Sequence, residues 1–152
     1  MSPAGDPLTA PPAADRPTVP GVSSTGMHVP DRHLRADLHM GADHSVITVV
    51  GELDSSSVEK FRDAVRRALI GGTRILVVDL GPITFLGSAG LAALMWTDKI
   101  GRRVDTSVRF VCPPENRLVS RPIELTGLAA YLALFPTQVD AAQWRLPHDG
   151  QV

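Results

Sequence analysis

The hydroxyl group best placed for chemistry in this sequence is that of Ser88. An apolar, mostly β-branched run at residues 75–78 is typical of a strand covered on both faces, and Gly81-Pro82 ends it. After Ser88, apolar residues recur at helical spacing, at Leu91, Leu94 and Met95. The first N–H groups of a helix have no internal partner and make its N-terminus electropositive. The pattern therefore predicts a strand, a loop and a helix in succession, with Ser88 at the loop-to-helix junction.

Two catalytic roles for Ser88 can be tested against its neighbours. A hydrolase nucleophile elbow requires glycine two residues before the serine, where this chain has Leu86, although Gly90 fits the later position. The general base is missing too, because the one histidine after Ser88 is His148, close to the end of the chain. A phosphate-binding loop would need a lysine that this stretch lacks. We expect no catalytic residue and no enzyme; the simplest role for Ser88 is an N-cap, worth about 1 kcal/mol.

The sequence predicts neither a metal site nor a cofactor. The histidines show no tight ligand spacing and are expected at the surface; they are His28, His33, His39, His44 and His148. Cys112 is the single cysteine, so an intrachain disulfide is impossible and a reducing compartment is favoured. Because it ends an apolar run at residues 108–112, we interpret Cys112 as a buried structural thiol.

Composition favours one soluble domain and excludes two classes of partner. The chain has 152 residues, 43% of them hydrophobic and 20% charged, with a formal net charge of -1. No basic stripe with interleaved aromatic residues is present, so we expect no nucleic acid partner. The apolar stretch at residues 75–96 is long enough to span a membrane, but Asp79 and Gly81-Pro82 interrupt it, so we expect no membrane contact. Residues 1–15 lack the basic and apolar regions of a signal peptide.

The chain divides into a domain and two tails. Residues 1–30 contain seven of the 13 prolines and almost no large apolar residue, which predicts a disordered tail. A docking role for this tail is the alternative to a plain solubilising extension. We expect one domain at residues 31–145 and a loose C-terminal tail at residues 146–152.

Periodicity predicts alternating strands and helices within that domain. Strands are expected at residues 34–40, an edge strand, and at 45–50, 75–78, 108–112 and 130–135, the first two forming a hairpin. Helices are expected from Val58 to the Gly71-Gly72 pair, from Ser88 onward, at 115–126 and at 137–144. Ser56 and Glu59 have the spacing of a capping box, and Thr137 with Asp140 that of a cap. Pro122 should kink the third helix or confine it to residues after Ser120.

Three stretches of the sequence resemble STAS domains, the anti-sigma factor antagonist family. The first contains Ser88 and comprises Asp79-Leu80, Ile83, Phe85, Leu86, Ser88, Gly90 and Leu91; the second is Gly51 to Glu59, and the third is Ile123 to Leu128. The resemblance covers about residues 34–144. It implies an α/β fold, a single STAS-like domain with a mixed four- to five-stranded sheet and about four helices.

The resemblance also implies a function by protein–protein binding. The implied partner is an anti-sigma factor of the kinase type, a histidine-kinase-like ATPase, whose capture releases a sigma factor, and the implied location is cytoplasmic. Ser88 corresponds to the serine that the partner kinase phosphorylates. The implied partner-binding residues lie in two loops that are side by side in the family: Glu52, Asp54, Ser55, Ser56, Leu86, Gly87, Ser88, Ala89 and Gly90. We further expect a monomer or weak dimer.

Two positions next to Ser88 leave a second interpretation open. The family usually has Asp before the serine and Ser or Thr after it, whereas this chain has Gly87 and Ala89. The alternative is a STAS scaffold or sensor module that works in another signalling complex without phosphorylation. Glu52 and Asp54 can likewise be simple turn and cap carboxylates.

Overall fold

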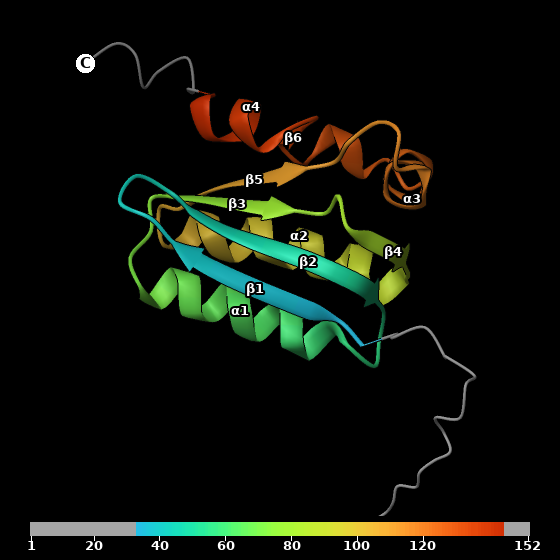
Figure 1. Ribbon diagram of the computed structural model, residues 1–152, viewed down its shortest axis with the longest axis horizontal. Coiled ribbons are helices and arrows are strands. Elements are labelled where there is room, and N and C mark those ends of the chain that lie inside the picture. Colours follow the sequence, from blue (N-terminus) through green and yellow to red (C-terminus); the bar gives the residue numbers. More distant parts are fainter. Residues whose placement is uncertain (1–32, 145–152) are drawn as a thin grey trace, which may run out of the picture. The chain divides into compact units, whose positions relative to one another are not determined.

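The computed structural model describes residues 33–144, which form a mixed sheet with helices packed against it (Figure 1). The strands are β1 (Arg35–Met40), β2 (Ser45–Leu53), β3 (Ile75–Asp79), β4 (Ile83–Leu86), β5 (Ser107–Val111) and β6 (Leu134–Phe135). The helices are α1 (Val58–Ile70), α2 (Ser88–Arg103), α3 (Arg117–Leu125) and α4 (Gln138–Gln143), with a short 3-10 helix, η2 (Leu128–Ala130). The expected α/β class with four helices is confirmed. The predicted tails, residues 1–30 and 146–152, lie outside the described residues.

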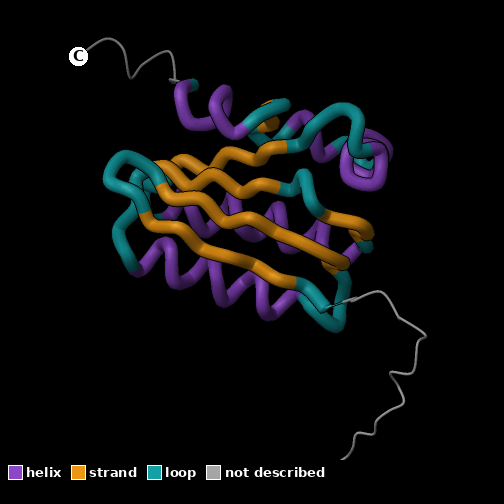
Figure 2. Tube along the Cα trace, in the orientation of Figure 1, coloured by secondary structure: helices purple, strands orange, loops and turns teal. Residues whose placement is uncertain are grey.

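The sheet has the strand order β1-β2-β3-β5-β6, and its strands lie side by side in Figure 2. β1 and β2 pair antiparallel as the expected hairpin, with β1 at the edge of the sheet, whereas β2, β3, β5 and β6 pair parallel. Parallel neighbours require a crossover: α1 connects β2 to β3, and α2 lies in the connection that runs from β3 through β4 to β5. The carboxyl ends of β2 and β4 therefore lie at one end of the sheet.

Two helices cover one face of the sheet and bury its apolar side chains. Alternate residues of β2 point to this face, which is why Ile47, Val49 and Leu53 are fully buried. They pack in one cluster with Phe61 of α1 and Leu94 of α2, and Figure 1 shows both helices on the same side of the sheet. On the opposite face a small cluster joins Val77 and Val111 to Ala141 of α4.

The strand β4 departs from the prediction, because residues 83–86 were expected to form a loop. β4 pairs parallel with the last residues of β2, with Leu53 opposite Leu86. The pairing shifts register between Gly51 and Glu52, where Gly51 has φ +106° and a side chain would meet the His33 carbonyl. Glycine is required at such a bulge. β2 is thereby extended to Leu53, and the described residues contain six strands where four to five were expected.

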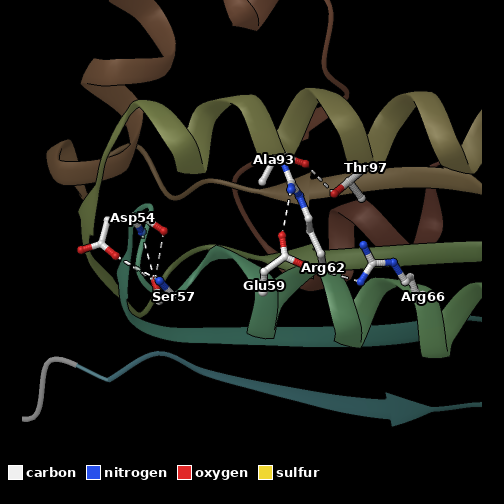
Figure 3. Close-up of polar contacts among 7 residues, drawn as sticks. All are labelled: Asp54, Ser57, Glu59, Arg62, Arg66, Ala93 and Thr97. Atoms are coloured by element: carbon white, nitrogen blue, oxygen red, sulfur yellow. Dashed lines mark hydrogen bonds and ion pairs between the residues drawn. The ribbon is translucent and has the colours of Figure 1, made fainter.

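The predicted capping box of α1 is wrong. The N-cap is Ser57, and its side chain makes no capping hydrogen bond. Glu59 lies within the first turn and pairs with two arginines instead, 2.9 Å from Arg62 Nη1 and 3.7 Å from Arg66 Nη1 (Figure 3). Both guanidinium groups lie 5.4 Å from the ring centroid of Trp96 on α2. Glu59 therefore helps to hold α1 against α2.

The C-terminal third differs from the prediction in two places. α3 begins at Arg117 and continues through Pro122, so it is not confined to residues after Ser120. Asn116 caps it, accepting from the Leu118 N–H, and this start before the proline explains the difference. The strand expected at residues 130–135 shortens to Leu134–Phe135 because η2 occupies its beginning.

Two expectations for the C-terminal third have a clearer outcome. The Thr137 cap of α4 is confirmed, because its hydroxyl accepts from the Asp140 N–H at 3.1 Å. Cys112 is half-buried, where a buried thiol was expected, and this burial raises the pKa of the thiol, with a smaller contribution from the Glu124 charge. The thiol is therefore poorly ionised at neutral pH, as fits a structural cysteine.

Candidate functional site

The two loops predicted to bind a partner lie side by side in the structure. Each follows the end of a strand, β2 or β4, and these strands pair in parallel with Leu53 opposite Leu86. The Gly87 N–H donates to the Leu53 carbonyl at 3.0 Å, which joins the loops directly. The distance between the Asp54 Cβ and the position that a Cβ would take at Gly87 is 3.7 Å. The expected juxtaposition of the residues around Asp54 and Ser88 is therefore present.

Close packing behind the loops depends on Gly90. A Cβ at this position would lie 2.7 Å from Leu86 Cδ1, 2.8 Å from the Leu53 carbonyl oxygen and 2.9 Å from Leu53 Cγ. No side chain fits there without movement of its neighbours. Of the predicted partner-binding residues, Leu86 and Gly90 are buried, and their close packing holds the two loops in register.

The first loop is organised by the Asp54 carboxylate (Figure 3). Its Oδ1 atom accepts from the Ser56 hydroxyl at 2.7 Å and from the backbone N–H groups of Ser56 and Ser57 at 3.0 and 3.2 Å. The Ser57 hydroxyl donates to the Glu52 carbonyl at 2.7 Å and accepts from the Asp54 N–H at 3.1 Å. Asp54 thus closes the turn that leads into α1, ahead of the N-cap Ser57, while the exposed Ser55 takes no part in these bonds.

The hydrogen bonds lower the pKa of Asp54 below its ordinary value. The hydrogen bond from the Ser56 hydroxyl is the main cause; desolvation opposes it, and the hydrogen bonds from the Ser56 N–H and the Ser57 hydroxyl and N–H lower the pKa further. The carboxylate is therefore ionised at neutral pH. Its Oδ2 atom has no hydrogen-bond partner among residues 33–144. A negative charge with a free oxygen is presented beside the second loop.

Ser88 is an exposed residue at the first position of α2, and the N-cap prediction for it is wrong. The N-cap is Gly87, whose extended backbone (φ -91°, ψ 179°) lets its carbonyl accept from the Leu91 N–H at 3.0 Å. Glycine has no side chain with which to cap, and the first turn of α2 holds no acidic residue. The first N–H groups of α2 are thus left without a side-chain acceptor, next to an exposed hydroxyl.

One feature of the second loop was missed at the sequence level. Phe85 is 49% exposed, and its ring edge lies 3.1 Å from the position that a Cβ would take at Gly87. A large aromatic residue directly before the Leu86-Gly87-Ser88 sequence was available as a signal, but the stretch was expected to be a loop leading into the helix. Because β4 pairs with β2, the Phe85 ring lies outside the core. Ala89, after Ser88, is half-buried.

The two loops present polar and aromatic groups at one surface. No group of three or more His, Cys, Asp or Glu in the described part of the chain could hold a metal ion. None of the helices within residues 33–144 is both long and apolar enough to cross a membrane. The loops carry the carboxylates of Glu52 and Asp54, four serine hydroxyls, a helix N-terminus and the Phe85 ring at the end of β4.

Comparison with known proteins identifies the class. The family model described as "Mlab, STAS domain" matches residues 36–136, and the chain therefore belongs to the STAS domain family. The anti-sigma-F factor antagonist RsfB of Mycobacterium tuberculosis is 36% identical over 104 residues, which cover 66% of this chain and 82% of RsfB.

Solved structures agree with this assignment. An anti-sigma factor antagonist from Mycobacterium paratuberculosis has a TM-score of 0.66 at 31% identity, covering 76% of this chain and 95% of that one. The anti-sigma factor antagonist SpoIIAA in its unphosphorylated form has a TM-score of 0.57 at 19% identity, covering 70% and 92% of the two chains, and shows the shared fold. The relatives are thus antagonists of anti-sigma factors by name, and the resemblance in the sequence is confirmed at the level of family and fold.

Proposed function

We propose that this protein is an anti-sigma factor antagonist that binds a kinase-type anti-sigma factor and so frees a sigma factor. The observation that carries the proposal is the exposed Ser88 at an uncapped helix N-terminus, beside the ionised Asp54 on the neighbouring loop. The similarity to RsfB supports this choice of partner class. Glu52, Asp54, Ser55, Ser56, Gly87, Ser88 and Ala89 supply the contact surface, and the domain that carries it comprises residues 31–145 of a cytoplasmic monomer or weak dimer.

Phosphorylation of Ser88 switches the complex off. Transfer of the γ-phosphoryl group of ATP to the Ser88 hydroxyl adds about -1.5 to -2 charge at pH 7 and leaves ADP. The free N–H groups of the first turn of α2 stabilise this anion, so the fold tolerates it. A docked partner would have to desolvate it next to Asp54, and burying an unpaired charge costs several kcal/mol. The domain remains folded while the complex dissociates.

The test combines binding and modification. The pure protein is passed over a panel of anti-sigma factors with and without ATP, and any binder is incubated with it and ATP before intact-mass spectrometry. Wild type and Ser88→Ala should bind, Ser88→Glu should not, and a mass increase of one phosphoryl group should appear in wild type alone. Binding of no panel member would contradict the proposal.

A second candidate function rests on the neighbours of Ser88. Gly87 and Ala89 supply neither a carboxylate nor a hydroxyl that could orient the serine or a kinase. A STAS scaffold or sensor module that binds its partner without phosphorylation needs neither group. No mass increase, together with undiminished binding of Ser88→Glu, would favour this alternative.

A further inference from the structure

A groove beside the Ser88 loop exposes apolar side chains from two elements. The side chains of Phe85 on β4, and of Leu118 and Leu125 on α3, are 49%, 56% and 71% exposed. They line a groove of about 290 Å3 together with Leu86, Arg117, Arg121 and Pro122. α3 packs directly against β4 (Figure 1). Residues of both elements line the groove, which therefore lies along their contact. Exposed apolar side chains gathered in one place are typical of a binding surface.

α3 is apolar on two sides, and one of them has no partner within the described residues. Val119 and Ile123 face the core and are buried. Leu118, Pro122 and Leu125 follow the i, i+4, i+7 spacing of a second stripe, which lines the groove. A surface helix needs only one apolar stripe to pack on its own domain. The second stripe therefore has the properties of an interface.

The charge along the groove selects the chemistry of its occupant. Arg117 and Arg121 both line the groove and both are exposed. Arg117 has a single ion pair within residues 33–144, a long one of 3.9 Å to Glu124, and Arg121 has none there. Arginine next to exposed aromatic and aliphatic side chains is the residue combination of binding hot spots. A partner segment whose charge complements these two arginines is acidic.

The groove is continuous with the surface that carries Ser88. Phe85 lines it, and the edge of the same ring lies 3.1 Å from the Cβ position of Gly87, the residue before Ser88. A partner that covers Ser88 and Asp54 therefore reaches Phe85 without crossing other structure. Asp54 is negative, whereas Arg117 and Arg121 are positive. The combined surface therefore favours one orientation of a bound partner.

We propose that this groove binds an acidic amphipathic helix of the anti-sigma factor, as a second contact next to the Ser88 loop. This inference rests on the proposed function for the identity of the partner. The apolar stripe of the incoming helix lies between Phe85, Leu118 and Leu125, and its carboxylates pair with Arg117 and Arg121. Such helix-in-groove docking uses apolar anchors at helical spacing for affinity and flanking charges for orientation.

The first arm of the test needs no natural partner. A helical peptide with leucine and glutamate at amphipathic spacing is titrated into the full-length protein, and the methyl resonances of Leu118 and Leu125 are followed by NMR. A peptide with lysine in place of glutamate is the control. The glutamate peptide should shift these resonances and the lysine peptide should not, and Arg117→Glu/Arg121→Glu should reverse the preference. Equal shifts, or none, would overturn the proposal.

The second arm uses an anti-sigma factor that binds in the panel. Leu118→Asp and Leu125→Asp should each lower its affinity by about tenfold or more, while Ile70→Asp and Val139→Asp, at other exposed apolar sites, should not. The double variant Arg117→Glu/Arg121→Glu should bind the anti-sigma factor more weakly, and its affinity should depend less on salt concentration. The control double variant Arg74→Glu/Arg103→Glu should change neither quantity. Thermal unfolding of each variant confirms that it is folded.

The two arms separate the groove from the proposed function. If Asp54→Lys loses binding but the groove variants do not, the groove proposal fails and the function stands. If wild type binds no anti-sigma factor but distinguishes the two peptides, the proposed function fails and the identity of the partner fails with it, while the preference of the groove for an acidic helix stands. A dimer that Leu118→Asp dissociates would assign the groove to a second copy of this chain. Altered Leu118 and Leu125 resonances after deletion of residues 2–28 would assign it to the chain's own N-terminal segment. Either result overturns the proposal.

Discussion

Gly90→Ala should destabilise the domain, although alanine is the better helix former. The new methyl group would lie 2.7 to 2.9 Å from atoms of Leu86 and Leu53. The Leu86 methyl can rotate away, but the Leu53 carbonyl is backbone and already accepts from the Gly87 N–H. Overpacking costs about 1–3 kcal/mol, and a weakened hydrogen bond costs about 1 kcal/mol. The gain in helix propensity returns about 1 kcal/mol, so the net loss is about 1–3 kcal/mol.

Denaturant unfolding measures this loss of stability and thermal unfolding measures the midpoint temperature, with Ala92→Gly as the control in both. Ala92 is exposed in the same helix, so its replacement should cost only the propensity difference of about 1 kcal/mol. Gly90→Ala should lower the unfolding midpoint temperature by about 4 °C for each kcal/mol lost. It should also weaken partner binding, because the two loops lose their common register. A variant more stable than wild type would show that the loops are not held together through Gly90.

Three further predictions concern the rest of the molecule. Asp54→Asn should lower the free energy of unfolding at pH 7. Because the folded pKa of Asp54 is lowered, this difference should shrink as the pH falls from the unfolded value of 3.8 toward the folded one; a difference independent of pH in urea titrations would contradict it. Arg109→Leu should cost about 1.5–3 kcal/mol and speed amide exchange in α4, because the 2% exposed Arg109 donates to the Ala141 carbonyl at 2.8 Å; unchanged exchange in α4 would refute this role. Deleting residues 2–28 should leave the thermal midpoint within a few degrees, on the evidence of their proline-rich composition; a larger drop would show that they stabilise the domain.

Long periodic elements of this fold could be predicted from the sequence, and short ones could not. The apolar spacing that begins at Val58 identifies α1, and Gly71 ends it as expected. β4 has only four residues, two of them exposed, so its period is too short to detect. It becomes a strand because the Gly51 bulge turns the end of β2 toward it. Such pairing is a tertiary effect that local propensity does not contain.

In the candidate site, too, some features could be predicted from the sequence and others could not. Sequence motifs placed Asp54 and Ser88 in one surface, and the parallel pairing of β2 with β4 brings their loops together. The capping assignments of Ser56 and Ser88 failed because a short run of serines and glycines offers several equivalent caps. Asp54, and not the Ser56 side chain, organises the turn because one carboxylate oxygen accepts from the backbone N–H groups of both Ser56 and Ser57. The exposure of Leu118 and Leu125 could not be predicted, because α3 has apolar residues on both of its sides.

The position before Ser88 gives the most direct test of how charge controls this site. Aspartate at position 87 would occupy the N-cap of α2, where a carboxylate contributes about 1 kcal/mol. It would also crowd the Phe85 ring and stand next to the Asp54 carboxylate, since the Cβ positions are 3.1 Å from Phe85 Cε2 and 3.7 Å from Asp54 Cβ. Glycine avoids both the crowding and the repulsion, and leaves the first-turn N–H groups free for a phosphate.

Gly87→Asp should therefore be less stable than Gly87→Asn, which has nearly the same shape without the charge. The difference should fall as ionic strength rises, because exposed charges are screened by salt. It should also fall in an Asp54→Asn background, since the second carboxylate is then absent. Equilibrium unfolding of the four variants, at low and high salt, gives the coupling between the two positions. If Gly87→Asp matches or exceeds Gly87→Asn in stability in both backgrounds, the N-cap gain outweighs the repulsion. Negative charge on the two loops is then not what keeps glycine beside Ser88.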